Sequence, residues 1–157
     1  MNKKTHNIEI IEFTNEFKDS IRSLNYEWLE KYFRIEKGDE ISLSNPKKYI
    51  IDKGGFIYYA KLNNEIIGTV SLIKKTDDVF EVGKMAVNSN AQGQKVGTIL
   101  LEFCLNIAKQ KHIKKLILYS NTSLKSAIHL YQKYGFAETV LEEGIYERAN
   151  IKMEKQL

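Results

Sequence analysis

The spacing of apolar residues along the chain changes between a period of two and a period of about 3.6, which predicts both strands and helices. Segments rich in aromatic and β-branched residues predict strands at residues 7–13, 56–62, 65–75, 80–87, 114–120, 137–141 and 146–154. The pair Asn63-Asn64 predicts a tight hairpin turn between the second and third of these. A helical segment between the strands at 80–87 and 114–120 favours parallel pairing of these two.

Four other segments have helical character. The first covers 15–33 with Thr14 as its N-cap, and a short one follows Pro46 over 47–52. The third begins near residue 96 and carries apolar residues at helical spacing, namely Val96, Ile99, Leu100, Phe103, Cys104 and Ile107. The fourth covers 124–134 and ends at Gly135. This order predicts an α+β fold, in which a mixed, mostly antiparallel sheet of about seven strands is flanked by about four helices.

Length and composition favour a single domain over residues 1–157. A chain of 157 residues can bury most of its apolar surface without disulfides or a metal. A single cysteine cannot form an internal disulfide, which suits a reducing compartment. This cysteine, Cys104, lies on the apolar face of a predicted helix, which indicates a core residue. The N-terminus has no apolar signal segment, and no apolar run approaches the roughly 18 residues of a membrane span. We therefore expect a cytoplasmic protein without membrane contact.

The net charge of +4 arises from 24 Lys and Arg against 20 Asp and Glu. The cations are scattered, and their densest group, at residues 109–115, lies across a helix end where cations complement the helix dipole. This distribution indicates a solvated face, so we expect no nucleic-acid partner. His6, His112 and His129 are also scattered, with no carboxylate or cysteine at ligand spacing, so no metal site is predicted.

A polar turn at residues 88–94 joins the strand at 80–87 to the helix that follows it. A helix N-terminus offers unpaired N–H groups and a partial positive charge, and Gly93 and Gly97 allow an anion to approach the backbone closely. By themselves, the two glycines fit a tight connection that only helps the helix to pack. The chain has neither the GxxxxGK[ST] nor the GxGxxG nucleotide pattern.

Two blocks of sequence stand out here: QGQKVG at residues 92–97 and AIHLYQKYGF at residues 127–136. In order and distance they resemble the Q/R-x-x-G-x-G/A and A-x-x-L-Y-x-x-x-G-F motifs of the GNAT superfamily of N-acetyltransferases. Lys95 departs from the first motif, because the family has glycine there. The resemblance covers about half of the chain and implies the GNAT fold, in which the strands at 80–87 and 114–120 splay apart to admit an acyl-pantetheine.

The resemblance also implies that acetyl-CoA is the cosubstrate and that the acetyl group passes directly to a primary amine of a small molecule or peptide. The implied acetyl-CoA contacts are the backbone of Met85, Ala86 and Val87 along the pantetheine, and Gln92, Gly93, Gln94, Lys95, Val96, Gly97 and Thr98 near the pyrophosphate. Asn121, after the strand at 114–120, is a further candidate, although a turn or a helix cap would explain it equally well.

Acetyl transfer needs a neutral amine, donors for the oxyanion and a proton for the departing thiolate. By resemblance, Tyr131 lies near the CoA sulfur as the general acid, and a phenol with a pKa of about 10 is protonated at neutral pH. Glu81 is the candidate general base, with a solvent-facing position as the alternative. In a regular strand it would share a face with Gly83, Met85 and Val87. A bulge there would free an N–H for the thioester oxygen.

Two features give opposite hints about the acceptor. Residues 25–40 combine aromatic and acidic side chains, which suits a cationic amine, although an ordinary amphipathic helix has the same pattern. Tyr146 and Arg148, at the start of the final predicted strand, could also reach the acceptor, and Arg148 would favour a carboxylate-bearing one. The sequence therefore leaves the acceptor open, and also leaves a homodimer open.

Two departures from the family pattern support an alternative function. Lys95 replaces a motif glycine, and Leu124 stands where the family often has an asparagine that contacts CoA. A non-catalytic acetyl-CoA-binding or sensor domain is the alternative to an enzyme.

Overall fold

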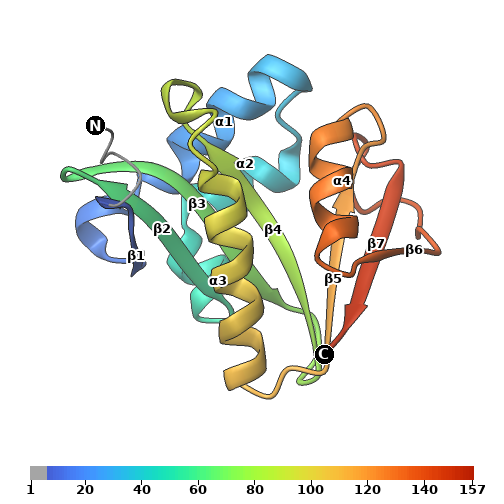
Figure 1. Ribbon diagram of the computed structural model, residues 1–157. Coiled ribbons are helices and arrows are strands. Elements are labelled where there is room, and N and C mark those ends of the chain that lie inside the picture. Colours follow the sequence, from blue (N-terminus) through green and yellow to red (C-terminus); the bar gives the residue numbers. More distant parts are fainter. Residues whose placement is uncertain (1–6) are drawn as a thin grey trace.

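The computed structural model describes residues 7–157, in which seven strands form one sheet with the order β1-β2-β3-β4-β5-β7-β6 (Figure 1). The strands are β1 (Glu9–Glu12), β2 (Phe56–Leu62), β3 (Glu65–Lys74), β4 (Val79–Val87), β5 (Lys115–Ser120), β6 (Ala137–Thr139) and β7 (Ile151–Gln156). Only β4 and β5 pair in parallel within this sheet. The predicted mixed, mostly antiparallel sheet is confirmed. One of the three histidines considered in the sequence, His6, lies outside the described residues.

The described residues form four α-helices, α1 (Ser20–Tyr32), α2 (Lys37–Ser44), α3 (Val96–Gln110) and α4 (Lys125–Lys133), and three short helical turns, η2 (Asn15–Phe17), η3 (Lys47–Ile51) and η4 (Ser89–Ala91). The single predicted helix over 15–33 is wrong in detail, because a turn interrupts it after η2 and Thr14 makes no side-chain cap. Helix α2 was not predicted. It begins with a capping box in which the Glu36 and Asp39 side chains bond each other's backbone, and Glu36 is an unusual N-cap residue.

The final two strands are shorter than predicted. Their predicted bounds were 137–141 and 146–154, but residues 140–150 form a loop between β6 and β7, which we call the 140–150 loop. Tyr146 and Arg148 of this loop bond side chains of β4 and α2 instead of a neighbouring strand. Local sequence does not reveal these distant partners, so the pattern of β-formers alone misplaced the strand.

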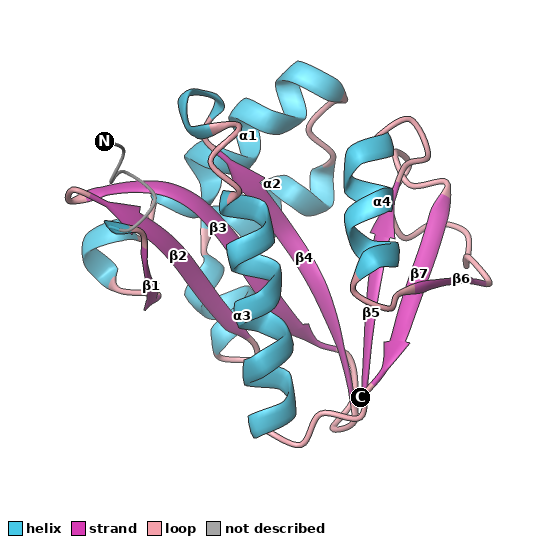
Figure 2. Cartoon of the chain, in the orientation of Figure 1, coloured by secondary structure: helices cyan, strands magenta, loops and turns pink. Residues whose placement is uncertain are grey.

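Helices cover both faces of the sheet (Figure 2). The first core cluster packs α3 and α4 against one face, and its fully buried members include Leu100 and Leu101 of α3 with Val70 and Leu72 of β3. The second core cluster lies on the other face, where Ile21 of α1, Leu43 of α2 and Ile50 of η3 meet Ile57 and Tyr59 of β2.

Cys104 belongs to the first core cluster and is completely buried. Burial raises the pKa of the Cys104 thiol to about 12, so the thiol is protonated at neutral pH. The prediction that Cys104 is a core residue is therefore confirmed.

Strand β4 contains a bulge near its middle. Ser71 of β3 lies opposite Gly83, and Thr69 lies opposite Ala86, so β4 has one more residue than β3 between these pairs. Lys84, in this interval, has a φ of 52°, in the left-handed region. A bulge of this kind bends the strand and changes which way the following side chains point.

The bulge changes the face to which the second half of β4 belongs. Phe80, Val82, Met85 and Val87 all pack with the first core cluster. Glu81 instead pairs with Ile73, a residue that packs with the second core cluster. The expectation that Glu81 shares a face with Met85 and Val87 is therefore wrong, because it assumed a regular strand.

Strands β4 and β5 pair over only three residues, from Val79 opposite Lys115 to Glu81 opposite Ile117. Beyond Glu81 the two strands diverge, as Figure 2 shows, with β4 continuing to Val87 and β5 to Ser120. The backbone groups that the two strands would otherwise exchange are left without strand partners on this side. The splay that the resemblance implied is present.

Close contact between β3 and α3 provides a test of this packing. A Cβ atom added to Gly68 of β3 would lie 2.8 Å from Val96 Cγ1 and 3.1 Å from Leu100 Cδ1, both on α3. We expect Gly68→Ala to lower the free energy of unfolding by about 1–3 kcal/mol, because the side chains of α3 must move away. Urea unfolding monitored by circular dichroism measures this change.

Gly38→Ala is the matched control, because nothing lies within 4 Å of a Cβ added at this position in α2. It should leave stability unchanged or raise it by up to about 1 kcal/mol, since alanine favours helix. Equal urea midpoints for Gly68→Ala and the unchanged protein would contradict the tight contact between β3 and α3.

Candidate active site

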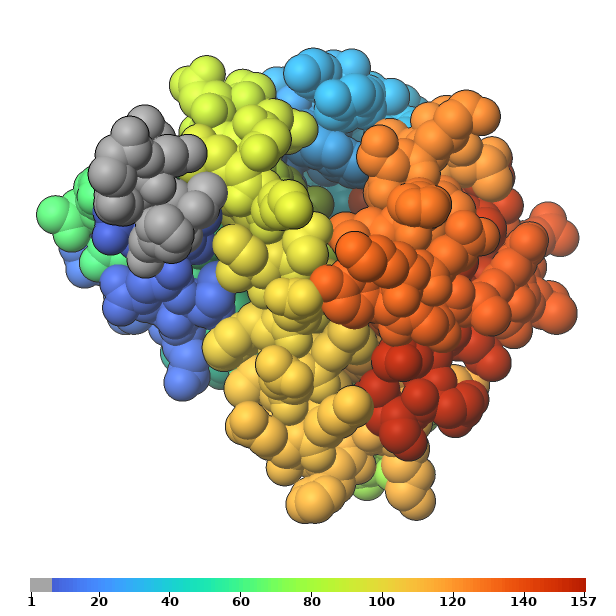
Figure 3. All heavy atoms as spheres, in the orientation of Figure 1, coloured from blue at the N-terminus to red at the C-terminus, as the bar shows by residue number. Residues whose placement is uncertain are grey.

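A cavity of about 240 Å³ lies where β4 and β5 diverge. Its wall includes residues from both sides of the sheet, since Tyr131 of α4 packs with the first core cluster and Trp28 belongs to α1 on the opposite side. Figure 3 shows the start of α3 in yellow and α4 in orange at the surface, with a hollow between them. The cavity thus connects the two faces of the sheet through the gap between β4 and β5.

The structure brings eight of the predicted site residues to the cavity: Glu81, Met85, Ala86, Val87, Gln92, Gly97, Asn121 and Tyr131. Five other predicted contacts, Gly93, Gln94, Lys95, Val96 and Thr98, do not line it. Val96 is buried in the first core cluster, where its side chain packs α3 against the sheet. The remaining four belong to the turn and the first residues of α3, outside this cavity.

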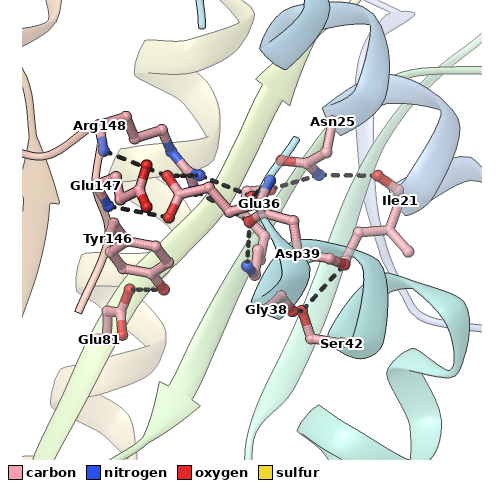
Figure 4. Close-up of polar contacts among 11 residues, drawn as sticks. Ile21, Asn25, Glu36, Gly38, Asp39, Ser42, Glu81, Tyr146, Glu147 and Arg148 are labelled. Carbon is pink, nitrogen blue, oxygen red and sulfur yellow. Dashed lines mark hydrogen bonds and ion pairs between the residues drawn. The ribbon is translucent and has the colours of Figure 1, made fainter. Parts of the chain in front are cut away.

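Glu81 is buried, with 2% of its surface exposed, so its carboxylate does not face solvent. The Tyr146 hydroxyl donates a hydrogen bond to Glu81 Oε2 at 2.9 Å (Figure 4). Lys75, which follows β3, has its Nζ 3.5 Å from Glu81 Oε1. A buried carboxylate that lines a cavity and accepts a hydrogen bond from a neighbouring hydroxyl is suited to exchange protons with a molecule bound there.

Tyr146 is held over the cavity by aromatic and cationic neighbours. Its ring meets the ring of Tyr119 edge-on, with centroids 5.6 Å apart. Arg148 Cζ lies 4.7 Å and Lys84 Nζ 5.4 Å from the Tyr146 ring centroid. Burial and the neighbouring Glu81 carboxylate raise the pKa of Tyr146 far above its usual range, so the hydroxyl remains a donor.

The bond between Tyr146 and Glu81 was not predicted from the sequence, in which Tyr146 was only a candidate contact of the acceptor. The two residues are separated by 65 positions along the chain, and only the 140–150 loop brings them together. Neither residue belongs to a motif, so no local signal in the sequence could have paired them.

A buried group of four charges ties the 140–150 loop to α2 and β4. Arg148 donates from Nη1 to Asp39 Oδ2 at 2.7 Å and from Nη2 to Asp39 Oδ1 at 3.1 Å. Arg148 Nη1 also donates to Glu36 Oε2 at 2.9 Å, and Lys84 Nζ donates to Asp39 Oδ1 at 3.0 Å. We call these four residues the Asp39 cluster; Figure 4 shows Glu36, Asp39 and Arg148 together.

Asp39 is the central member of this cluster, with 1% of its surface exposed. Burial raises the pKa of Asp39, but the hydrogen bond from Arg148 and the charge of Lys84 outweigh burial and bring it below its usual value. The carboxylate is therefore ionised at neutral pH and binds both cations. Neither Asp39 nor its partners formed a recognisable motif in the sequence.

Tyr131 lies on α4, and its ring meets Phe136 edge-on at 6.1 Å between centroids. Burial raises the pKa of Tyr131 to about 12, so this phenol is protonated at neutral pH. The hydroxyl can donate a hydrogen bond to an atom that gains negative charge inside the cavity. Tyr131 thus reaches the cavity from the α4 side, whereas Glu81 and Tyr146 reach it from the side of α1 and α2.

The turn before α3 explains why glycine is expected where this chain has Lys95. Lys95 is the N-cap of α3, and its φ of 61° and ψ of 28° lie in the left-handed region that glycine adopts freely. Gly93 also has a positive φ of 87°, and nothing lies within 4 Å of a Cβ added there or at Gly97. The open backbone at the start of α3 therefore fits an anionic group, since its first N–H groups have no partner within the helix.

Asn121 fulfils the turn role that the sequence left open. Its side-chain amide donates to the Arg148 carbonyl at 2.8 Å, and its Oδ1 accepts from the Ser123 backbone N–H at 2.9 Å. The bond to Arg148 attaches the end of β5 to the 140–150 loop, and the bond from Ser123 closes the turn that follows β5. Asn121 lines the cavity, and its side chain is already engaged within the protein.

Two further properties concern the chain from residue 7 onward. Within this part, no group of three or more His, Cys, Asp or Glu side chains is arranged to hold a metal ion. No helix in it combines the length and the apolar character needed to cross a membrane.

Comparison with known proteins gives a consistent family assignment. A model of the acetyltransferase (GNAT) family matches residues 16–136, more than half of the chain. Streptothricin acetyltransferase A of Bacillus subtilis (strain 168) is 27% identical over 117 residues, which cover 73% of this chain and 64% of that protein. The chain spans between 28% and 64% of the length of the curated relatives it matches.

Solved structures share the fold over nearly the whole chain. A GNAT-family acetyltransferase from Staphylococcus aureus Mu50 superposes with a TM-score of 0.85 at 23% identity, covering 95% of this chain and 98% of that one. A GNAT-family acetyltransferase from Elizabethkingia anophelis, solved with acetyl-CoA bound, is 29% identical with a TM-score of 0.64, covering 96% and 99%. The seven-stranded sheet of residues 7–157 is therefore a GNAT fold.

The Asp39 cluster gives a prediction about stability and pH. The pKa of Asp39 is lowered in the folded protein from an ordinary value of 3.8, so its stabilising effect is fully present above about pH 5. The effect is lost as the pH falls through the lower, folded pKa. We expect Asp39→Asn to lower the free energy of unfolding by about 3–5 kcal/mol at neutral pH, because it leaves buried cations without their carboxylate.

Urea unfolding from about pH 7 to about pH 2.5 measures both effects, and the Asp39→Asn variant should lose less stability on acidification than the unchanged protein. Asp52→Asn is the control, since Asp52 pairs with Lys47 on the exposed surface and its loss should change stability by about 0.5 kcal/mol or less. An unchanged acid slope in Asp39→Asn would show that Asp39 does not carry the effect.

Proposed function

Because the chain belongs to the acetyltransferase (GNAT) family, we propose that it is an N-acetyltransferase that uses acetyl-CoA and acts as a single domain over residues 1–157. In this proposal the acetyl group passes directly to a primary amine of a small molecule or peptide while both substrates are bound. The observation that carries the proposal is the cavity between β4 and β5, which Glu81 enters from one side of the sheet and Tyr131 from the other.

The open turn before α3 supports a position for the pyrophosphate of acetyl-CoA. Residues 92–98 include the backbone N–H groups at the start of α3, and Gly93 and Gly97 leave space beside them. The exposed Lys95 adds a cation to this turn. The relative from Elizabethkingia anophelis was solved with acetyl-CoA bound, which supports the same ligand here.

The free edge of β4 supports a position for the pantetheine arm. After Glu81 this edge has no β5 partner, so the backbone of residues 85–87 is available to bond an extended ligand. The bulge at Lys84 redirects the strand at this point. Asn25 of α1 stabilises the bulge, because its side-chain amide donates to the Lys84 carbonyl at 3.1 Å.

The side chains at the two ends of the cavity have complementary roles in this proposal. Acetyl-CoA supplies the activated acetyl thioester. Glu81 accepts the proton that the amine nitrogen loses as the new N–C bond forms. Tyr131 donates its hydroxyl hydrogen to the sulfur as the C–S bond breaks, and its raised pKa keeps this hydrogen in place at neutral pH. Tyr146 holds the Glu81 carboxylate toward the cavity.

The alternative, a non-catalytic acetyl-CoA-binding or sensor domain, rested on Lys95 and Leu124. Lys95 adopts a left-handed conformation that glycine adopts freely, so this chain forms the turn without a glycine at this position. Buried Glu81 and its hydroxyl donor would have no evident use in a domain that only binds. These two observations favour the enzyme.

Substitution of the two proposed catalytic residues tests the function. We expect Tyr131→Phe and Glu81→Gln each to lower kcat by about 10²- to 10⁴-fold, because each removes a group that transfers a proton. The dissociation constant for acetyl-CoA should remain nearly unchanged. CoA release with a panel of amines measures turnover, and isothermal titration calorimetry measures binding.

Tyr134→Phe is the matched control for Tyr131→Phe. Tyr134 follows α4 as its C-cap, and its hydroxyl donates to Glu102 on the surface, away from the cavity. Its substitution should leave turnover nearly unchanged. Tight acetyl-CoA binding without acetyl transfer to any amine, amino acid or peptide would overturn the proposed activity and support the sensor domain.

Two variants of Lys95 test the turn. Lys95→Gly relieves the left-handed backbone, whereas Lys95→Ala keeps its cost of about 1 kcal/mol, so the glycine variant should be the more stable in thermal unfolding. Both variants lose the cation, and both should bind acetyl-CoA several-fold more weakly at low salt, with a smaller difference at high salt. Binding that is unchanged at low salt would exclude a phosphate contact by Lys95.

A further inference from the structure

Two pairs of aromatic side chains line the side of the cavity that an acceptor would approach. Trp28 of α1 lines it together with Phe33, and their ring centroids lie 5.5 Å apart. Tyr119 of β5 and Tyr146 of the 140–150 loop form a second aromatic pair. An acceptor that reaches Glu81 from this side must therefore pass between aromatic side chains, which favour an apolar body.

The two cations at this side are already neutralised. Arg148 is bonded to Glu36 and Asp39, and Lys84 is bonded to Asp39, so two positive charges meet two negative charges. The charged groups of Lys84 and Asp39 are almost fully buried, and those of Arg148 and Glu36 are largely so. A carboxylate on the acceptor would have to lose its water without finding an unpaired cation in this cluster.

Glu81 is the remaining charged side chain that lines the cavity, and it is negative. An acceptor amine must come close to Glu81 to give up its proton, so a carboxylate on the neighbouring carbon would lie near a second carboxylate. Like charges in a partly desolvated site repel each other. Lys75 lies against the opposite Glu81 oxygen and is partly exposed, so it reduces this charge without entering the cavity wall.

We propose that the acceptor is a primary amine on an apolar, preferably aromatic, body, with no carboxylate beside the amine. This inference rests on the proposed N-acetyltransferase function and specifies its substrate class. Arg148 consequently serves to hold the 140–150 loop and does not bind an acceptor carboxylate. The opposing hints in the sequence are resolved because the acidic side chains of Glu36 and Asp39 neutralise the cations that would attract an acid.

Matched acceptors that differ only beside the amine test the proposal. Phenethylamine, phenylalaninamide and phenylalanine share one aromatic body and carry, respectively, no group, a neutral amide and a carboxylate. Each kcat/KM value is divided by the fraction of neutral amine at the assay pH, because the three amines ionise differently. We expect the corrected kcat/KM values for phenethylamine and phenylalaninamide to exceed the value for phenylalanine by at least about tenfold.

The outcomes separate this proposal from the function on which it rests. Acetylation of phenylalanine as fast as phenethylamine would overturn the proposed acceptor class but would support an N-acetyltransferase. No transfer to any of the three, nor to a wider panel of amines and peptides, despite acetyl-CoA binding, would overturn both.

Two variants test the two parts of the argument separately. Glu36→Gln removes one of the carboxylates bonded to Arg148. The ratio of kcat/KM for phenylalanine to kcat/KM for phenethylamine should therefore rise at least several-fold. Trp28→Ala should lower kcat/KM for phenethylamine more than for ethylamine, which lacks the ring. Ile41→Ala is the control, since Ile41 lies on the neighbouring helix α2, is 43% exposed and does not line the cavity.

An unchanged ratio of phenylalanine to phenethylamine in Glu36→Gln would contradict neutralisation of Arg148 as the cause of the preference. If Trp28→Ala lowered kcat/KM for phenethylamine and for ethylamine by the same factor, Trp28 would not contribute to binding the aromatic ring of the acceptor. Thermal unfolding of each variant identifies any loss that arises from misfolding, and the ratios between acceptors do not depend on the amount of folded protein.

Discussion

The parting of β4 from β5 after Glu81 is the constraint on which the rest of the structure depends. A sheet that remained paired along both strands would be closed at its centre, and the side chains of its two faces could not meet. Three residue pairs hold the two strands together at one end. Beyond them, the bulge at Lys84 turns β4, and Asn25 of α1 satisfies the carbonyl that the bulge leaves free. The cavity is the space that this departure opens.

The diverging strands need support from elsewhere, because they no longer bond each other. The Asp39 cluster provides this support on the side of α1 and α2. Its buried carboxylate joins α2, the bulge of β4 and the 140–150 loop through Lys84 and Arg148. The same loop carries Tyr146 to Glu81. One group of charges therefore stabilises the open sheet and holds the loop that carries Tyr146 to Glu81, and both of its cations are paired within the protein.

Sequence motifs predicted one side of the site better than the other. The turn before α3 and the α4 signature are continuous in sequence, so their residues can be recognised together, and Tyr131 does reach the cavity. On the side of the cavity that we propose for the acceptor, Trp28, Glu81 and Tyr146 come from α1, β4 and the 140–150 loop, and their spacing follows no pattern. Helix α2, with the two acids of the Asp39 cluster, was not predicted because Glu36 is a rare N-cap residue.

By itself, the sequence determined the alternation of strands and helices, the hairpin at Asn63-Asn64, the parallel crossover through α3 and the two motifs of the acetyltransferase (GNAT) family. These depend on neighbouring residues and on periodicity, which a linear chain displays directly. Only the tertiary structure decided which face Glu81 occupies, which hydroxyl binds it and whether Arg148 has a free charge. The physical reason is that a single extra residue in β4 reverses the order of its faces. In addition, Asp39 bonds Lys84 and Arg148, and Glu81 bonds Tyr146, across more than 40 residues of the chain.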